Sequence, residues 1–343
     1  MPVGTNAAVR GLTPAELRSV GAQCVLGNTY HLWLRPGPDL IERAGGLHGF
    51  MGWDGPILTD SGGFQVLSLR SRCVVNEAGA TFRSHFDGTE WLLTPEVSME
   101  VQAKLGSDIA MALDVCPPYG CGPRELDEAT QRTLRWGERS LAAPHAIGQA
   151  VFGISQGGTD LELRAVAATA LSSLPFDGYG IGGLSVGERR DETWPALAAS
   201  IANLPKDRPR YLMGVGTPED LIEGISRGVD LFDCVLPTRL GRTGTVFSSD
   251  GELDLRQSRF RSLNGPIDSE CDCRACTRFS LGYLHHLFRA SEELAMRLAS
   301  LHNVRFLVRL VANAREAICD GECESSSARA SDRTSRLALV EQA

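Results

Sequence analysis

Short apolar runs recur along this chain of 343 residues, and each ends in a glycine or a polar turn. Most of them are followed by a stretch with the start signals of a helix. With a partial strand at the N-terminus, the runs predict eight strands, at residues 2–4, 24–27, 56–59, 109–113, 151–154, 179–182, 211–214 and 231–235. Alternating strands and helices pair in parallel, and eight repeats over roughly 240 residues suit a (β/α)8 barrel, an α/β fold of the TIM type. A doubly wound open sheet is the structural alternative.

Three of the expected helices begin with the same signal. A threonine stands directly before a proline, and a glutamate follows within the first turn, at Thr13, Thr94 and Thr217. The threonine side chain accepts a hydrogen bond from a free N–H group of the first turn, and proline suits the first helical position because its missing N–H is not needed there. We therefore expect helices to start at residues 14, 95 and 218.

The alternation stops near residue 250, which predicts a change of domain. Residues 250–310 contain several arginines, a dense cysteine cluster and then a helical pattern over 283–315. We expect the barrel to occupy residues 1–250, and a zinc-binding subdomain with closing helices to occupy 251–318. The Ser-rich, polar stretch 319–343 is predicted to be a disordered tail.

A short cysteine-rich loop predicts a metal site. Three cysteines at C-x-C-x-x-C spacing can bind one ion from a single tight loop: Cys271, Cys273 and Cys276. A histidine from a later helix would complete a closed, tetrahedral zinc site with no open position for a substrate or an activated water. His302 is the candidate for this fourth ligand, and spacing leaves His285 and His286 open. The alternative is that these are free thiols of a reduced protein.

Polar residues gather where the predicted strands end. Asp60, Asp114 and Gln156 follow three of the strands, and Asp233 lies within the last one. In a barrel the carboxyl ends of all strands open on one face, and that face holds the active site. Each acid alone could be a helix cap or a turn residue. A carboxylate in an apolar strand is costly unless it is paired or used, so the three together favour a catalytic role.

Paired carboxylates without a catalytic metal suit substitution at an anomeric carbon. One acid attacks or stabilises the oxocarbenium-like sugar, while the other transfers a proton to or from the leaving group. A third acid that accepts hydrogen bonds from N–H groups suits a purine-like base, and Phe64 and Met213 are apolar partners for the faces of such a base. Glycines after the strands allow the backbone to approach a flat ligand closely.

Composition and charge narrow the function without fixing it. A hydrophobic content of 43% and a charged content of 22% are typical of a soluble globular protein, and no apolar run is long enough for a membrane span. The start of the chain lacks the pattern of a signal peptide, and ten cysteines without a disulfide framework indicate a reducing cytoplasm. The net charge of −8 argues against nucleic-acid binding. The arginines between 239 and 261 could still form a local patch, with an ordinary solvated face as the alternative.

Several long motifs resemble those of the tRNA-guanine transglycosylases, also called queuine tRNA-ribosyltransferases. They are MPVGT at 1–5, LGNTYHLWLRPG at 26–37, LTDSGGFQV at 58–66, GIGGLSVGE at 180–188, YLMGVGTPED at 211–220, DCVLPTR at 233–239 and the cysteine cluster at 271–276. The resemblance covers the chain from its first residue to the end of the predicted subdomain. It implies a zinc-containing (β/α)8 barrel that exchanges guanine at the wobble position of tRNAs with GUN anticodons, those for Asp, Asn, His and Tyr, for a 7-deazaguanine base.

The resemblance also implies a role for each matching residue. By its motif, Asp233 is the nucleophile that attacks C1′ of the nucleotide, and Asp60 is the general acid/base that serves the departing and incoming bases. Arg239 and Arg242 match positions near the phosphates of the anticodon loop. The zinc ligands implied are Cys271, Cys273, Cys276 and His302. The base-binding residues implied are Asp114, Gln156, Gly183, Leu184, Phe64, Met213, Cys116 and Glu188, with Glu188 pairing to the 183–184 peptide.

Members of this family form homodimers and act in queuosine biosynthesis. Cys116 and Val186 match the bacterial pocket for the small aminomethyl base preQ1, which favours preQ1 over queuine as the incoming base. The chain departs from the bacterial pattern in three ways. The family usually begins some thirty residues earlier, so we expect a short or missing N-terminal cover. Val115 stands where many bacterial members have a glutamate, and the tail after residue 320 lacks the usual ending.

Two alternative functions come from other classes. A non-catalytic family member that binds tRNA or supports an active subunit would be expected to lose the acids at the strand ends, whereas this chain keeps all three. A glycoside hydrolase would have no need for a zinc-binding subdomain beside an arginine patch. The sequence therefore favours the transglycosylase.

Overall fold

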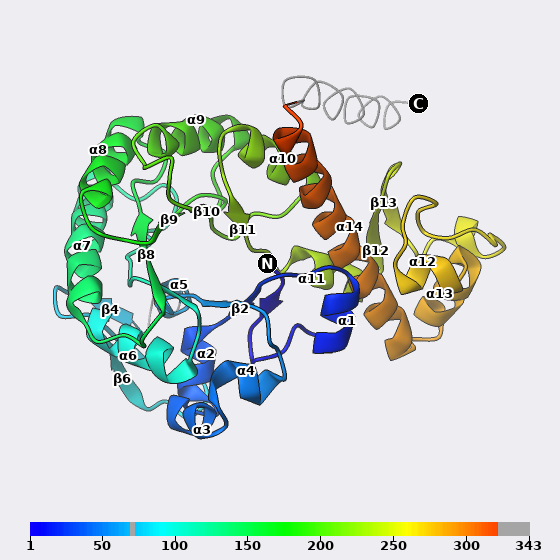
Figure 1. The fold of residues 1–343 in the computed structure, drawn as a ribbon, viewed down its shortest axis with the longest axis horizontal. Coiled ribbons are helices and arrows are strands. Elements are labelled where there is room, and N and C mark those ends of the chain that lie inside the picture. Colours follow the sequence, from blue (N-terminus) through cyan, green and yellow to red (C-terminus); the bar gives the residue numbers. More distant parts are fainter. Residues whose placement is uncertain (69–72, 322–343) are drawn as a thin grey trace.

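The barrel predicted from the strand pattern is present in the computed structural model, which describes residues 1–68 and 73–321. Eight parallel strands lie side by side in chain order (Figure 1). They are β1 (Val3–Gly4), β2 (Val25–Gly27), β3 (Ile57–Thr59), β7 (Ile109–Met111), β8 (Ala150–Ser155), β9 (Gly178–Ile181), β10 (Arg210–Leu212) and β11 (Leu231–Phe232). A parallel bridge joins Pro2 to Cys234, and the Met1 nitrogen donates to the Phe232 carbonyl at 2.7 Å, so the first and last strands meet.

Side chains along each strand alternate between the inside of the ring and the layer under the helices. Leu26 and Leu58, which are partners in the β2–β3 register, belong to a cluster that includes Met111, Phe152 and Tyr211. Their neighbours along the chain belong to a different cluster, packed beneath the helices. Because the side-chain period of a strand is two, this alternation decides which residues face the barrel axis.

Helices surround the ring, as predicted for this fold (Figure 1). They are α1 (Pro14–Ser19), α2 (Thr29–Leu34), α3 (Pro38–Arg43), α4 (Gly46–Met51), α5 (Gly63–Ser68), α6 (Pro95–Leu105), α7 (Pro123–Ala142), α8 (Leu161–Ser172), α9 (Arg190–Ile201), α10 (Pro218–Ser226) and α11 (Leu236–Thr243). The three predicted helix starts are confirmed: Thr13, Thr94 and Thr217 each accept a backbone N–H in the first turn and precede a proline. Within residues 1–68 and 73–321, none of the helices combines the length and the apolar character that crossing a membrane requires.

A small antiparallel sheet interrupts the barrel between β3 and β7. It consists of β4 (Cys73–Val75), β5 (Ala80–Arg83) and β6 (Glu90–Leu93), which pair in that order. The sequence pattern did not predict it, because these strands are only three or four residues long and the first lacks a buried residue. Short strands with one half-buried face leave little periodicity to detect.

The last part of the chain forms a smaller lobe beside the barrel (Figure 1). It contains the hairpin β12 (Thr245–Ser248) and β13 (Gly251–Asp254), the short helix η2 (Ser258–Phe260), and helices α12 (Arg274–Arg278) and α13 (Leu281–Arg289). The helical pattern expected over 283–315 is two helices rather than one, because Ser291 adopts a left-handed conformation (φ 59°) after the end of α13. The proposed division of the chain at residue 250 stays a prediction.

The long helix α14 (Glu293–Cys319) lies between the lobe and the barrel (Figure 1). It packs most closely on α11, and a Cβ at Gly241 would come within 2.6 Å of the Ser300 nitrogen. From α14, the Asn303 amide donates to the carbonyls of Pro237 and Thr245, each at 3.0 Å, and accepts from the Phe247 N–H at 3.0 Å. One side chain therefore joins this helix to α11 and to the hairpin. Residues 322–343 of the predicted tail lie outside the described residues.

Candidate active site and metal centre

Asp60 directly follows β3, at the carboxyl end of the barrel, and is buried. Its Oδ1 accepts from the backbone N–H groups of Thr29 at 2.9 Å and Gly62 at 3.2 Å. Its Oδ2 accepts from the side-chain amides of Asn28 at 2.6 Å and Gln65 at 3.1 Å. Four donors thus hold this carboxyl group in one orientation, and two of them come from the end of the neighbouring strand β2.

The environment of Asp60 moves its pKa toward neutrality. Burial raises the pKa of this carboxyl group to about 7, against the N–H groups of Thr29, Gly62 and Gln65, which hold it down. The charge of Asp233 raises the pKa further, so the two carboxyl groups lie close enough to interact. An acid whose pKa is near the working pH can both give and accept a proton.

Asp233 follows β11 and is held by β10 and the turn after it. Its Oδ1 accepts from the Tyr211 hydroxyl and from the Gly214 N–H, the latter at 2.7 Å. Its Oδ2 makes no hydrogen bond with any residue in the described part of the chain. Asp233 is only partly buried, so one oxygen is fixed and the other can meet a ligand. The structure therefore brings Asp60 and Asp233 to one end of the barrel, as the sequence predicted.

Asp114 and Gln156 form a directly bonded, buried pair. Gln156 Nε2 donates to Asp114 Oδ2 at 2.7 Å, and the Ser61 hydroxyl donates to Asp114 Oδ1 at 3.1 Å. Burial raises the pKa of Asp114, against the hydrogen bonds from Gln156 and Ser61. A Cβ at Gly63 would lie 3.2 Å from Asp114 Oδ1, so glycine lets α5 start close to this carboxyl group. The pair offers fixed hydrogen-bonding groups next to Asp60.

The loop after β9 closes over Gln156. Gly183 has φ +67°, and a Cβ on it would come within 2.3 Å of Gln156 Oε1, so only glycine fits here. Leu184 is buried, and Ser185 takes a left-handed conformation (φ 58°) that is uncommon outside glycine. Glu188 was expected to pair with the 183–184 peptide, but it accepts instead from the N–H groups of Ser185 and Val186, the second at 2.9 Å. It also accepts from the Thr193 hydroxyl at 2.9 Å.

The other residues predicted to bind a base differ in how far they are buried. Cys116 is half-buried, and burial, with the charge of Asp114, raises the pKa of its thiol to about 12, so it is a neutral group. Met213 follows β10 and is half-buried, whereas Phe64 on α5 is 55% exposed. Val115 is buried in the apolar cluster with Trp136.

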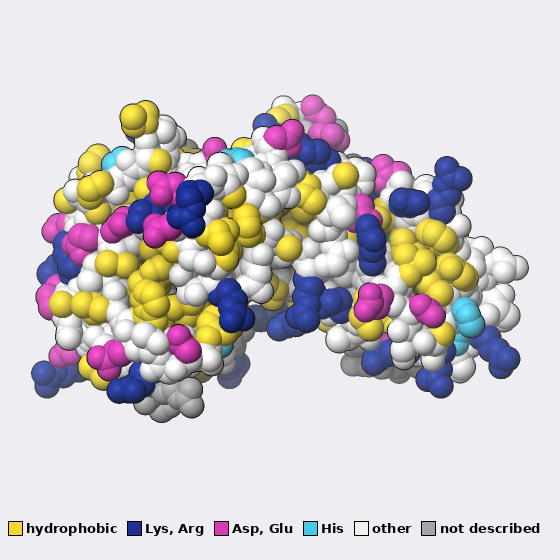
Figure 2. Space-filling model, turned by 90° about the horizontal axis from the view of Figure 1, so that it is seen from below, with side chains coloured by type: hydrophobic (Ala, Val, Ile, Leu, Met, Phe, Trp, Pro, Cys, Tyr) yellow, Lys and Arg dark blue, Asp and Glu magenta, His cyan; other side chains and the backbone are white. Residues whose placement is uncertain are grey.

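Three arginines of the barrel lie near one another: Arg10, Arg239 and Arg242. Arg242 is half-buried, and its pKa is lowered first by burial and then by the charges of Arg10 and Arg239, which therefore lie nearby. Arg239 and Arg242 are both on α11, which starts three residues after Asp233. Figure 2 shows Lys and Arg side chains beside the hollow between the two parts of the molecule. Among the arginines further along the chain, Arg256 is paired with Asp254 at 2.8 Å.

The predicted metal ligands come together in the lobe. One ligand atom from each of Cys271, Cys273, Cys276 and His302 lies within 4.8 Å of the others. His302 Nδ1 is 3.3 Å from Cys276 Sγ, and its Nε2 bonds to the Phe247 carbonyl at 2.6 Å, which leaves Nδ1 free to bind an ion. His285 instead bonds to the Leu255 carbonyl, and His286 is exposed. The cluster fits a tetrahedral ion, and His302 is the histidine in place to complete it.

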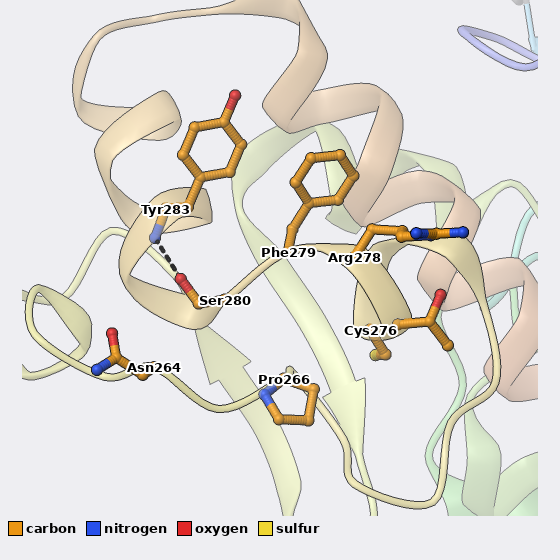
Figure 3. A pocket seen from close by; sticks show the side chains of 8 residues that line it. Asn264, Pro266, Cys276, Arg278, Phe279, Ser280 and Tyr283 are labelled. Carbon is orange, nitrogen blue, oxygen red and sulfur yellow. Dashed lines mark hydrogen bonds between the residues drawn. The ribbon is translucent and has the colours of Figure 1, made fainter.

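Two cavities lie away from the aspartates. The larger, of about 480 Å³, is on the lobe and is lined by Phe279, Tyr283, Arg278, Pro266 and the metal ligand Cys276 (Figure 3). Phe279 and Tyr283 stack there with their ring centroids 5.4 Å apart. The smaller, of about 230 Å³, adjoins Glu188 on the outer side of the loop after β9. Neither cavity contains an acid of the Asp60–Asp233 pair.

The sequence reasoning missed the residues that hold the candidate site in place. Three of them lie in predicted strands or just after them, so their positions indicated that they could reach the site: Asn28, Thr29 and Tyr211. Arg10 and Arg164 carried no such signal, because they lie outside the strand ends. Arg164 is nonetheless fully buried, and its guanidinium lies beside Gly183 in the loop that closes over Gln156.

Known proteins match this chain over nearly its whole length. The family model described as Queuine tRNA-ribosyltransferase matches residues 1–335. The queuine tRNA-ribosyltransferase of Herpetosiphon aurantiacus is 51% identical over 95% of this chain and 83% of its own length. That of Caldanaerobacter subterraneus is 53% identical over 93% and 85%, and that of Sphingopyxis alaskensis is 52% identical over 94% and 87%. This chain belongs to the queuine tRNA-ribosyltransferase family.

Proposed function

We propose that this chain is a tRNA-guanine transglycosylase, a pentosyltransferase of queuosine biosynthesis. It exchanges guanine at the wobble position of GUN-anticodon tRNAs, those for Asp, Asn, His and Tyr, for a 7-deazaguanine base. The observation that carries the proposal is the pair Asp60 and Asp233: each carboxyl group is held at one oxygen or more, and the charge of one raises the pKa of the other.

The reaction would be a double displacement. Asp233 Oδ2 attacks C1′ of the nucleotide, the C1′–N bond to guanine breaks, and Asp60 gives its proton to the departing base. The incoming base then loses a proton to Asp60, its nitrogen attacks C1′, and the bond between C1′ and Asp233 breaks. Two inversions retain the configuration of the sugar. No other energy source is needed, because one glycosidic bond replaces another.

Asp114 and Gln156 would recognise the base. The Asp114 carboxylate accepts hydrogen bonds from N–H groups of a guanine-like ring, and the backbone of Gly183 and Leu184 borders the same pocket. Phe64 and Met213 would cover the ring faces. Phe64 is exposed enough to move onto a bound base, and the target nucleotide must leave the anticodon stack to reach this pocket.

We favour preQ1 over queuine as the incoming base. The Ser185 N–H is bound by Glu188, and in a planar trans peptide the Leu184 carbonyl must point the opposite way. A carbonyl so placed suits the ammonium group of an aminomethyl substituent. Cys116 and Val186 would limit the room for a larger group. Competition between the two bases in guanine exchange measures this preference directly.

The remaining partners follow the same proposal. Arg239 and Arg242, with Arg10, would contact phosphates of the anticodon loop. The Cys271, Cys273, Cys276 and His302 cluster would hold one structural Zn²⁺ per subunit, since three thiolates and an imidazole are ligands that zinc prefers. We further propose that the protein is a homodimer and acts in the cytoplasm, where its thiolates stay reduced.

Incorporation of labelled guanine into a GUN-anticodon tRNA tests the proposal. The native protein should exchange the base and trap a covalent RNA adduct, and Asp233→Asn should abolish both. Asp230→Asn is the matched control, because Asp230 precedes the same strand at the opposite end of the barrel and bonds only to the backbone of Arg210. Binding of tRNA without exchange by the native protein would instead support an accessory, non-catalytic subunit.

A further inference from the structure

Arg164 is a fully buried arginine that the proposed reaction leaves without a role. It lies on α8, and it donates from Nε to the Gly158 carbonyl at 2.7 Å and from Nη1 to the Ser155 carbonyl at 3.2 Å. Burial lowers its pKa to about 10, so the guanidinium is still positively charged at neutral pH. Within the described part of the chain no carboxylate pairs with it, and its Nη2 has no hydrogen-bond partner. Such a group is costly to bury unless it is used.

Gln156 carries the matching unsatisfied atom. Its Nε2 bonds to Asp114, but its Oε1 is buried without a partner among the described residues. The two unsatisfied atoms border the same residue: a Cβ at Gly183 would lie 2.3 Å from Gln156 Oε1 and 3.6 Å from Arg164 Nη2. Gln156 Oε1 needs a donor, and Arg164 Nη2 can supply one.

We infer that Arg164 is a positioning residue that fixes the orientation of the Gln156 amide, by donating from Nη2 to Oε1 directly or through one water. This inference rests on the proposed function, which places Gln156 in the base pocket. In the present structure Asp114 also fixes the amide, because it accepts from Nε2. A bound base would engage Asp114 through its own N–H groups, and Arg164 would then be the remaining anchor.

The orientation of this amide decides which base the pocket accepts. With Oε1 held by Arg164, Nε2 faces the base and donates to its exocyclic oxygen. An amino group at that position would meet a donor instead of an acceptor and would be rejected. A charged donor on Oε1 also polarises the amide and strengthens the bond that Nε2 makes. Arg164 therefore selects guanine-like bases over bases such as 2,6-diaminopurine, without touching either.

Substitution of Arg164 tests the inference through selectivity. Arg164→Met frees the amide to turn over, so the ratio of the 2,6-diaminopurine inhibition constant to the guanine KM should fall about 10-fold or more, the size expected for loss of a charge-assisted hydrogen bond. The loss should appear mainly in KM for guanine rather than in kcat. Arg164→Lys keeps a cationic donor and should restore most of the selectivity.

Arg210→Met is the matched control. Arg210 is likewise a buried arginine that donates to backbone carbonyls, those of Leu204, Pro205 and Gly228, but it lies at the opposite end of the barrel strands. It should lower stability without changing the selectivity ratio. If Arg164 acts through Gln156, then Arg164→Met should add nothing to the selectivity change of Gln156→Ala in a double-mutant cycle.

A structure of the native protein with guanine bound tests the role of Arg164 even if Arg164→Met does not fold. Arg164 Nη2 should bond to Gln156 Oε1 directly or through one ordered water. Finding Oε1 turned toward the base, or unchanged selectivity in a folded Arg164→Met protein, overturns the inference. Failure of the native protein to exchange guanine at all would instead refute the proposed function, so the two failures are distinguishable.

Discussion

The Tyr211 hydroxyl donates to Asp233 Oδ1, the oxygen that also accepts the Gly214 N–H. Both donors come from β10 or the turn after it, whereas Asp233 follows the neighbouring strand β11. The carboxyl group is thus fixed from one side, by the strand next to it. Because Oδ1 is occupied, Oδ2 is the oxygen that we propose to attack, and the phenol supports the proposed nucleophile.

Tyr211→Phe should therefore slow formation of the covalent RNA adduct by about 10-fold or more, because the hydrogen bond removed is one to a charged group. Quenched single-turnover reactions with a tRNA substrate measure this rate. Tyr179→Phe is the control, since Tyr179 is a buried tyrosine of the adjacent strand β9 that makes only a long, 3.5 Å bond to a backbone carbonyl. An equal effect of the two substitutions would contradict a special role for Tyr211.

The buried carboxyl group of Asp60 should make stability depend on pH. Its pKa is about 7 when folded, against 3.8 as the ordinary value, so the folded state binds the proton more tightly. The resulting stabilisation is fully present below pH 4 and is lost as the pH rises through 7, by at most about 4 kcal/mol. Asp60→Asn cannot titrate here, so the stability of the native protein relative to this variant should fall across that range.

Urea unfolding of both proteins between pH 4 and 8.5 measures this difference. The exposed Asp207→Asn provides the comparison, because its curve should run parallel to that of the native protein. Parallel curves for Asp60→Asn as well would show that the folded state does not raise the pKa of Asp60.

Metal binding should depend on His302 and not on the other histidines of the lobe. His302→Ala should lose the ion and lower the melting temperature by several degrees, because a structural metal contributes folding free energy directly. His286→Ala should retain the ion, since His286 is exposed. Metal analysis of the purified variants, with zinc as the expected element, gives the answer. Retention of a full complement of metal by His302→Ala would be incompatible with the assigned ligand set.

RNA binding should weaken, and depend less on salt, when α11 loses its charges. Arg239→Gln and Arg242→Gln should each reduce the slope of log affinity against log salt by about 1, the value for one lost phosphate contact. Arg256→Gln should leave the slope nearly unchanged, because Arg256 is paired with Asp254. Titrations of a GUN-anticodon stem-loop at several salt concentrations compare the three. A steeper loss for Arg256 than for Arg239 would place the RNA on the lobe rather than along α11.

The fold was predictable because its signals are local. Each apolar run is followed by a turn. The threonine–proline pairs before α1, α6 and α10 mark the starts of these helices by a signal that is only a few residues long. The break at Ser291 could not be predicted, because neither glycine nor proline marks it. The position of the three aspartates followed from the fold itself, since the barrel brings all strand ends to one face.

The surroundings of these acids depend on contacts between distant residues. The amide of Asn28 bonds to Asp60, which lies 32 positions further along the chain. The register of β2 on β3 sets the direction in which this amide points. Arg164 is on a helix, where a charged residue ordinarily points to water. Only its burial and its approach to Gly183 distinguish it from the other arginines.

Asn303 follows His302 on α14 and clamps Pro237, the second residue of the helix that carries Arg239 and Arg242. Loss of the cysteine cluster should therefore displace the two arginines that we propose to contact RNA, whereas the aspartates keep their own hydrogen-bond partners. Without its ion, the enzyme should then keep a normal kcat at saturating RNA, but its activity should fall at low RNA concentrations. Assays at saturating substrate would miss that defect altogether.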